Sequence, residues 1–263
     1  MLKRACPIQY DKAATQGRTN PLFVTCELSD GSIIEVVVKF SGCCDQGNIN
    51  LAREVIACCL AGDLGLPVPE PYLVEVSGEW AATVPDEARR AQIDASSDVA
   101  FGSRVMTGQF ATWSSGNLVS DLMLPAAAGI FVFDAITQNP DRRAANPNCL
   151  VRGDELRIID HELTFSHELV LGWKPPWMQD GLKHLESPGY HIFRERLRGR
   201  VIDYGLIRDA WQGLSDAKVA DYEAALPTEW PDVGHSAASA MKLIRDARDN
   251  IDAVLEEVKR VLS

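Results

Sequence analysis

The sequence has little positive charge and no long apolar run. Its 263 residues include 26 Lys and Arg against 37 Asp and Glu, which gives a formal net charge of −11. This balance disfavours nucleic acid as a partner, because the phosphate backbone is itself negative. No window approaches the ~18 apolar residues of a membrane helix, and the N-terminus MLKRACPIQYDK leads into no signal-peptide core. We therefore expect a cytoplasmic globular protein without a membrane partner.

The spacings of several common sites are also missing. The seven cysteines include no C-x-x-C pair, which predicts reduced thiols rather than a zinc or redox site. Two His-Glu pairs, at 161–162 and 167–168, begin like the zinc motif H-E-x-x-H, but Phe165 and Leu171 stand where the second His belongs. There is no G-x-S-x-G motif for a nucleophilic serine. Zinc-dependent and serine-dependent hydrolysis are therefore disfavoured.

Two patterns divide the chain. In the first 80 residues, apolar runs bounded by turn residues predict three strands and a helix that begins near Leu51. The predicted strands are Leu22–Leu28, Ser32–Phe40 and Pro71–Val76. From about Asp121 the pattern is helical, and the nearly all-apolar stretch up to Asn139 predicts a buried helix.

The remaining segments predict the limits of the two parts. The polar stretch from Asp86 to Asp98 is interpreted as a mobile connection, and we expect a boundary between two lobes near residue 107. Apolar residues at helical spacing from Met241 to Leu262, with charged residues between them, predict one long amphipathic helix that packs on the body.

A predicted hairpin near residue 150 brings polar side chains together. A turn at Gly153-Asp154 sets residue 147 opposite Asp160, so that Asn146 and Asp160 meet at the open end. Asp141 lies five residues before Asn146, within reach of the same space. Oxygen ligands of this kind suit Mg²⁺, and D-x-x-x-x-N followed by a metal-binding Asp is typical of phosphoryl-transfer enzymes. The alternative is that these are loop residues in Asx turns and local ion pairs.

A buried ion pair is predicted in the first part of the chain. Glu54 falls in an otherwise apolar column of its helix, and a buried carboxylate needs a partner. Lys39, at the end of the preceding strand, can supply one and would then hold its ammonium over the α- and β-phosphates of a nucleotide. The alternative for Lys39 is an ordinary half-exposed strand residue.

The phosphate cradle has the weakest signal. The chain contains neither G-x-G-x-x-G nor G-x-x-x-x-G-K-[ST]. Residues 14–19 precede the first predicted strand, and the backbone around Gly17, Arg18 and Thr19 is a candidate for binding phosphate. A plain turn is the alternative.

The sequence resembles the HipA-like kinases through GRTNP, VVVKF, GLPVPEP, FGSR, NPDRRAANPN and IIDHE, which occur in family order. The resemblance implies a compact protein-kinase or phosphatidylinositol-kinase fold with ATP and Mg²⁺ as cofactors. It makes Lys39 the phosphate lysine, Glu54 its partner, Asp141 the catalytic aspartate, and Asn146 and Asp160 the metal ligands. It also implies a protein acceptor and an antitoxin-type partner, because members are similar to serine/threonine kinases and several are toxins of toxin-antitoxin pairs.

The chain departs from common protein kinases at several motifs. Asn139-Pro140 replaces the His-Arg before the catalytic Asp, His161-Glu162 replaces Phe-Gly, and no A-P-E follows. An ordinary activation loop is therefore not expected.

We predict an α+β, two-lobed, kinase-like fold. Residues 1–107 would form a small β-rich nucleotide-binding lobe and residues 108–263 a mostly helical catalytic lobe, with Met106 at their boundary as a further nucleotide-binding residue. The predicted activity is ATP- and Mg²⁺-dependent transfer of the γ-phosphate to a protein hydroxyl. The alternatives are a nucleotide-binding pseudokinase and a small-molecule kinase, for which the acidic net charge would suit a cationic acceptor.

Overall fold

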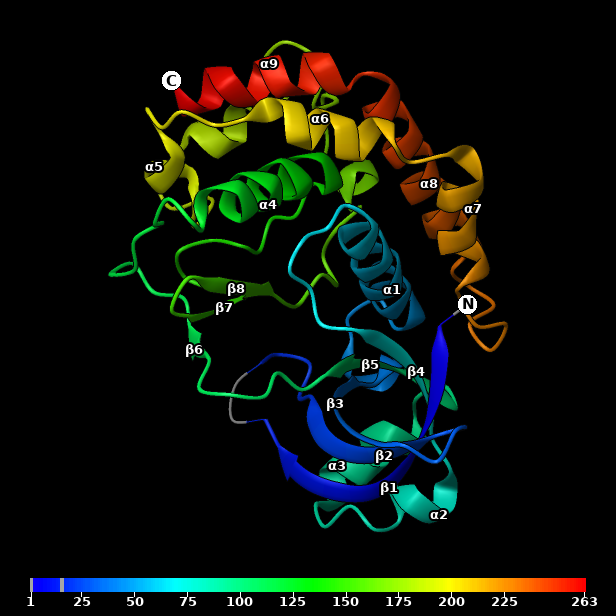
Figure 1. The fold of residues 1–263 in the computed structure, drawn as a ribbon. Coiled ribbons are helices and arrows are strands. Elements are labelled where there is room, and N and C mark those ends of the chain that lie inside the picture. Colours follow the sequence, from blue (N-terminus) through cyan, green and yellow to red (C-terminus); the bar gives the residue numbers. More distant parts are fainter. Residues whose placement is uncertain (1, 15–16) are drawn as a thin grey trace.

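Strands and helices occupy different parts of the molecule. The structure, a computed structural model, describes residues 2–14 and 17–263. Five strands gather at one end, and most of the helices form the other end (Figure 1). The α+β class predicted from the sequence is confirmed at this level.

The strands at one end form a small closed barrel. Their order is β1-β2-β3-β5-β4, and the sheet closes because β4 also pairs with β1 in parallel. Alternation of buried and exposed residues along β2 and β3 accounts for their prediction, which is correct to within one residue at each end. The barrel strands are β1 (Lys3–Ala13), β2 (Leu22–Leu28), β3 (Ile33–Lys39), β4 (Pro71–Glu75) and β5 (Val99–Arg104).

The segment between β4 and β5 is helical, so the mobile connection expected from Asp86 to Asp98 is wrong. It contains α2 (Gly78–Ala81) and α3 (Glu87–Asp94). The Asp86 carboxylate accepts a hydrogen bond from the Arg89 N–H and so caps α3. Ile93 is the one buried residue of α3 and packs into the barrel core.

Helix α1 (Asn48–Asp63) lies between the barrel and the remaining helices (Figure 1). It is buried on nearly all sides, and it starts three residues before the predicted Leu51. Leu51 packs with residues of β4 and β5, whereas Ile56 and Leu60 belong to the core of the helical part. The helix therefore connects β4 and β5 of the barrel to the core of the helical part.

The helical part surrounds α4 (Leu124–Thr137), in which every residue from Ala127 onward is buried. This confirms the predicted buried helix. The hairpin of β7 (Cys149–Arg152) and β8 (Glu155–Ile158), with β6 (Ala111–Thr112) beside it, lies between α4 and the barrel (Figure 1). The outer helices are α5 (Arg194–Leu197), α6 (Tyr204–Gln212), α7 (Asp216–Ala224), α8 (Gly234–Asp249) and α9 (Ile251–Leu262). Short 3₁₀ turns are at Ser41–Cys43, His167–Leu169 and Lys183–Glu186.

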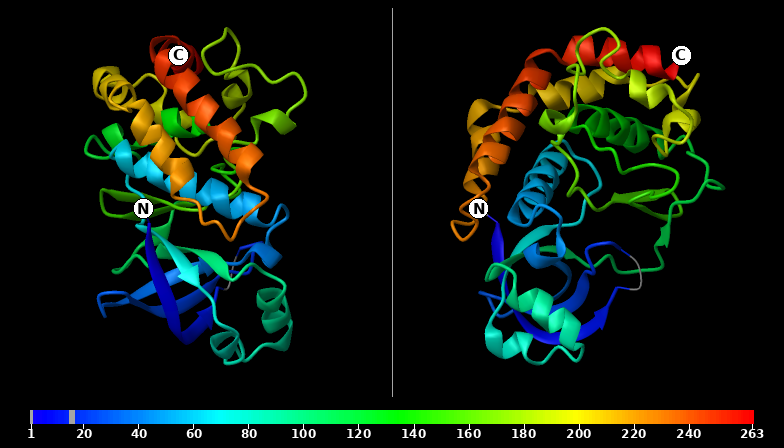
Figure 2. Two further views of the ribbon diagram at one scale, coloured as in Figure 1. Left: turned by 90° about the vertical axis from the view of Figure 1, so that its right-hand side faces the viewer. Right: turned by 180° about the vertical axis from the view of Figure 1, so that it is seen from behind.

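The single C-terminal helix predicted from the sequence is wrong, because the chain turns between α8 and α9 (Figure 2). Asn250 leaves the helical conformation at φ −113° and ψ 21°, and its side-chain amide donates to the Asp246 carbonyl at 2.8 Å. An Asn side chain that bonds the local backbone favours a helix end. The apolar residues continue on both sides of the turn, which is why their spacing gave no sign of it.

All seven cysteines are free, as the sequence predicts. Among the residues that the structure describes, none of the helices combines the length and the apolar character needed to cross a bilayer.

Candidate active site

Lys39 and Glu54 form the ion pair that the sequence predicts. Lys39 ends β3, Glu54 lies in α1, and the Lys39 ammonium donates to Glu54 Oε1 at 2.5 Å. The side chains of Lys39 and Glu54 are 9% and 1% exposed, so this pair has almost no contact with water. Because Glu54 lies on an otherwise apolar face of α1, the pair explains how a carboxylate can be buried there.

The Lys39 ammonium also binds two carboxylates from the segment after β8. It donates to Asp160 Oδ1 at 2.7 Å and to Glu162 Oε2 at 3.0 Å. Burial alone would lower the pKa of Lys39, but the charges of Glu54, Asp160 and Glu162 outweigh it and raise that pKa well above its usual value. Lys39 therefore stays charged and holds the three carboxylates at one point.

Glu54 has a second partner in the same segment. Its Oε2 accepts the backbone N–H of His161 at 2.9 Å. Burial would raise the pKa of Glu54, but the Lys39 charge and the bonds to Lys39 and His161 lower it to about 2. Asp160, directly before His161, has the left-handed φ of 61°, which Asp tolerates better than most residues. Glu54 thus fixes the chain directly after Asp160.

The hairpin register agrees with its prediction. Cys149 pairs with Ile158 around the turn, and the Ile159 N–H donates to the Asn148 carbonyl at 3.0 Å. Continuing this pairing sets residue 147 opposite Asp160, as expected. The loop that contains Asp141 and the segment that contains Asp160 are therefore held side by side.

Asp141 lies in that loop and is bound by two amides. Its Oδ2 accepts the side-chain N–H groups of Asn146 at 2.6 Å and of Asn148 at 3.2 Å. The amide of Asn146 is therefore turned to Asp141, not to Asp160 as the predicted hairpin suggested. Burial and the nearby charge of Asp160 raise the pKa of Asp141 above its usual value. The charge of Asp160 therefore acts on the carboxyl group of Asp141.

A buried hydrogen-bond network connects the Asp141 loop to helix α4. Asp134 of α4 accepts hydrogen bonds from Arg142 Nε at 2.6 Å and from the Asn139 amide at 2.9 Å, and it lies 3.0 Å from His191 Nε2. Arg142, which is fully buried, also donates to the carbonyls of Asn148 and Ile159. We call Asp134, Asn139, Arg142 and His191 the Asp134 network. It joins α4 to both chain segments that hold the site.

The predicted phosphate loop connects β1 to β2. Leu22, at the start of β2, pairs with Val38 of β3, so this loop lies at the Lys39 end of the sheet. Gly17 has a φ of 112°, Thr19 is buried, and Arg18 pairs with Asp45. Thr15 and Gln16, part of the same predicted loop, lie outside the described residues.

Met106 follows β5 by two residues, at the other end of the strand pairing. Phe101 of β5 is opposite Lys39, and the Val105 N–H donates to the Glu35 carbonyl at 2.9 Å. The structure therefore does not bring Met106 beside Lys39. Its contact with a nucleotide remains a prediction.

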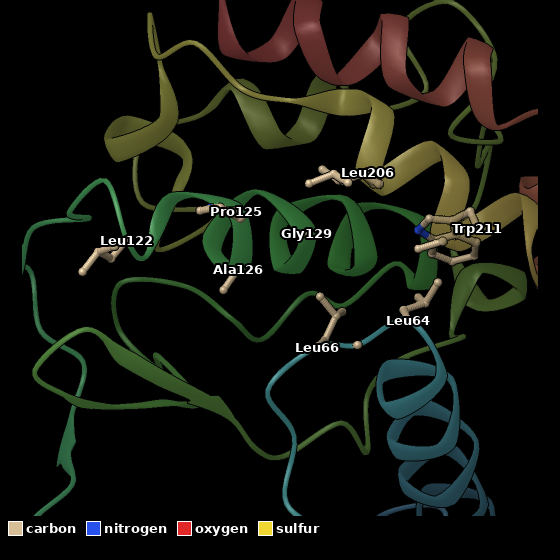
Figure 3. A pocket seen from close by; sticks show the side chains of 11 residues that line it. Leu64, Leu66, Leu122, Pro125, Ala126, Gly129, Leu206 and Trp211 are labelled. Atoms are coloured by element: carbon tan, nitrogen blue, oxygen red, sulfur yellow. The ribbon is translucent and has the colours of Figure 1, made fainter.

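A pocket of about 340 Å³, lined by apolar side chains, lies elsewhere, between the turn after α1 and helices α4 and α6 (Figure 3). Leu64 and Leu66 line it from the turn, Gly129 from α4, and Leu206 and Trp211 from α6. The pocket shares no residue with the groups around Lys39 and Asp141, and it offers no carboxylate or ammonium for phosphate chemistry.

Sequence reasoning missed Glu162, Asn148 and the Asp134 network. Glu162 carried no regular signal, because it follows Asp160, whose φ of 61° is left-handed, in a segment without helix or strand periodicity. Asn148 and Asp134 carried none either.

Comparisons with known proteins identify a family and a similar fold. The family described as HipA-like kinase has a sequence model that matches residues 8–260. Among solved structures, the chain is similar to the Helicobacter pylori proinflammatory kinase CtkA, with a TM-score of 0.52, 15% sequence identity, and 98% of each chain covered. At that identity the similarity concerns the fold alone. No curated protein matches the chain in sequence.

Proposed function

The chain belongs to the HipA-like kinase family, and from that premise we propose that it transfers the γ-phosphate of ATP to a protein hydroxyl in a Mg²⁺-dependent reaction. The observation that supports this most is the position of Lys39, which is bound by Glu54 on one side and by Asp160 on the other. In protein kinases a lysine on this strand, paired with a helix glutamate, contacts the nucleotide phosphates.

In this proposal the barrel and α1, within residues 1–107, are the nucleotide-binding lobe, and residues 108–263 are the catalytic lobe. Lys39 contacts the α- and β-phosphates, and Glu54 keeps its ammonium in place. The loop with Gly17, Arg18 and Thr19 covers the phosphates with its backbone N–H groups, and Met106 contacts the base. The position of the loop at the Lys39 end of the sheet supports this assignment.

Asp141 orients the acceptor hydroxyl and takes its proton as the phosphoryl group is transferred. The raised pKa of Asp141, caused by burial and by the charge of Asp160, is consistent with a group that accepts a proton. Asn146 and Asn148 fix its carboxylate through their amides.

The residues present suit a divalent cation. Asp160 and Asn146 offer oxygen atoms, the ligands that Mg²⁺ prefers, and the Asp160 side chain is 28% exposed while that of Glu54 is 1% exposed. Asp160 and Asn146 would hold the ion, which neutralises charge on the phosphates when it is bound.

The test is transfer of labelled γ-phosphate from ATP with Mg²⁺, to protein and small-molecule acceptors in parallel. The wild type is compared with Asp141→Ala, Asp160→Asn and, as a control, Asp94→Ala at the exposed end of α3. We expect Asp141→Ala to lower transfer by about 10²- to 10⁴-fold while calorimetric nucleotide binding survives. Asp160→Asn should weaken binding of Mg²⁺ and ATP together, and EDTA should stop transfer until Mg²⁺ is added back.

Full activity of Asp141→Ala would contradict the assignment of the catalytic aspartate. Label on small hydroxyl compounds but on no protein would replace the protein acceptor with a small-molecule one. Nucleotide binding without transfer to any acceptor would indicate a binding module instead of a working kinase.

A further inference from the structure

Glu162 is a third carboxylate on the Lys39 ammonium, beside Glu54 and Asp160. Its Oε2 lies 3.0 Å from Lys39 Nζ, and its side chain is 9% exposed. Its backbone carbonyl accepts the side-chain amide of Asn50 at 2.9 Å, so α1 fixes Glu162 from a second side. Glu162 is thus an ordered, nearly buried partner of Lys39.

The hydrogen bonds of Lys39 account for all of its donors. An ammonium has three N–H groups, and in this structure they point to Glu54, Asp160 and Glu162. A nucleotide phosphate can contact Lys39 only if one of these three partners yields a donor. The side chains of Glu54 and Glu162 are 1% and 9% exposed, whereas that of Asp160 is 28% exposed.

Asp160 is therefore the partner that can yield. Its side chain is the most exposed of the three, so a cation can reach its carboxylate more readily than either buried one. Once Asp160 turns away from Lys39, Glu54 alone would leave the ammonium free to pivot about a single contact. Glu162 removes that freedom, because it holds Lys39 from the opposite chain segment.

We infer that Glu162 is a positioning residue, which together with Glu54 holds Lys39 so that the third N–H of the ammonium points to the nucleotide phosphates. This inference rests on the proposed kinase function. In this arrangement Glu54 and Glu162 anchor the ammonium of Lys39, and a nucleotide phosphate takes the place of Asp160.

The experiment measures kcat and KM for ATP in the wild type, Glu162→Gln and Glu162→Ala. Glu257→Gln is the matched control, because the Glu257 side chain is 11% exposed, close to the 9% of Glu162, and pairs with Arg260 on α9. Loss of a charged hydrogen bond corresponds to about 10- to 100-fold. We expect Glu162→Ala to raise KM for ATP and lower kcat by a combined factor of that size. Glu162→Gln keeps an acceptor oxygen and should lie between Glu162→Ala and the wild type, and Glu257→Gln should match the wild type.

A second measurement separates positioning from general stability. In a Lys39→Met background, Glu162→Gln should change the dissociation constant of Mg²⁺-ATP by less than about twofold, because its effect passes through Lys39. Thermal unfolding of each variant identifies any that fail to fold. Glu162→Gln, which preserves side-chain volume, then supplies the test if Glu162→Ala is unfolded.

The outcomes distinguish this inference from the function on which it rests. A wild type that neither binds nor hydrolyses nor transfers ATP would contradict the proposed kinase activity itself. Suppose instead that the wild type is active and that Lys39→Met impairs it. If Glu162→Ala then behaves like Glu257→Gln, only the role of Glu162 is overturned. Equal effects of Glu162→Gln with and without Lys39 would also overturn it.

Discussion

Lys39 is the cation to which the carboxylates of Glu54, Asp160 and Glu162 are all bound, and this makes it important for stability as well as for chemistry. Glu54 and Glu162 are almost inaccessible to water. A buried carboxylate without a cation is costly, so the fold depends on the ammonium even when no nucleotide is bound.

We predict that Lys39→Met lowers the free energy of unfolding at pH 7 by about 3–5 kcal/mol, the usual cost of removing one member of a buried ion pair. In the wild type the pKa of Glu54 is lowered from its ordinary 4.5, so its contribution to stability is present above pH 4.5 and is lost as the pH falls. The difference between variant and wild type should therefore shrink below about pH 4.5. Denaturant unfolding at pH 7 and at pH 4 measures both effects.

Lys242→Met is the control for this prediction. The Lys242 side chain is 75% exposed and pairs with Asp246 on the surface of α8, so its loss should change stability by less than about 0.5 kcal/mol. If Lys39→Met were as stable as Lys242→Met, the three carboxylates would not need their ammonium.

The site residues differ in how far sequence can predict them. Glu54 was predictable because helical spacing alone shows a charge on an apolar face, and Lys39 because a buried charge needs a nearby partner. Glu162 lies 123 residues from Lys39 in sequence and in an irregular segment. No periodicity describes such a segment, so its contact with Lys39 depends on tertiary structure.

At the scale of elements, the Asp134 network fixes the position of the Asp141 loop and of the segment after β8 relative to α4. Arg142 bonds Asp134 of α4, the carbonyl of Asn148 and the carbonyl of Ile159. These three contacts come from a helix, a loop and the end of a strand. Arg142 therefore sets the separation between the Asp141 loop and Asp160 without itself reaching the site.

We expect Arg142→Met to lower the free energy of unfolding by about 3–5 kcal/mol, because it leaves Asp134 buried without its main cation. Activity should fall by a larger factor than the fraction of folded protein, because Arg142 no longer holds the Asp141 loop and the segment of Asp160 in place. Chemical denaturation gives the stability, and activity per folded molecule gives the second effect. Arg143→Met, at a neighbouring side chain that is 57% exposed, should leave stability within about 0.5 kcal/mol. Equal stability of the two variants would rule out this role for Arg142.

The elements that the sequence predicted have a clear pattern of apolar residues or a clear turn, namely strands β2, β3 and β4, helices α1 and α4, and the hairpin of β7 and β8. Strand β1 was missed because most of its residues are exposed and its pairing shifts register after Pro7, so it shows no alternation. Helix α3 was missed because it buries only Ile93. The turn at Asn250 depends on one local hydrogen bond, to which hydrophobic spacing is insensitive.

At the scale of the whole molecule, the proposed division at residue 107 does not separate two independent cores. Helix α1 contributes Leu51 to a cluster with β4 and β5, and contributes Ile56 to the cluster that contains α4 and α8. This one helix therefore covers apolar side chains of β4 and β5 and also fills part of the helical core. The barrel and the helical part should therefore unfold together.

Hydrogen exchange tests this coupling. Leu22 of β2 is 1% exposed in the barrel core, and Leu22→Ala should cost about 2–5 kcal/mol through the cavity it leaves. If unfolding is a single cooperative event, the protection of amides in α8 should fall by the same free energy as that of amides in β3, although α8 has no residue in the barrel core. Unchanged protection of α8 would mean that the barrel opens by itself. The lobes would then be separate folding units.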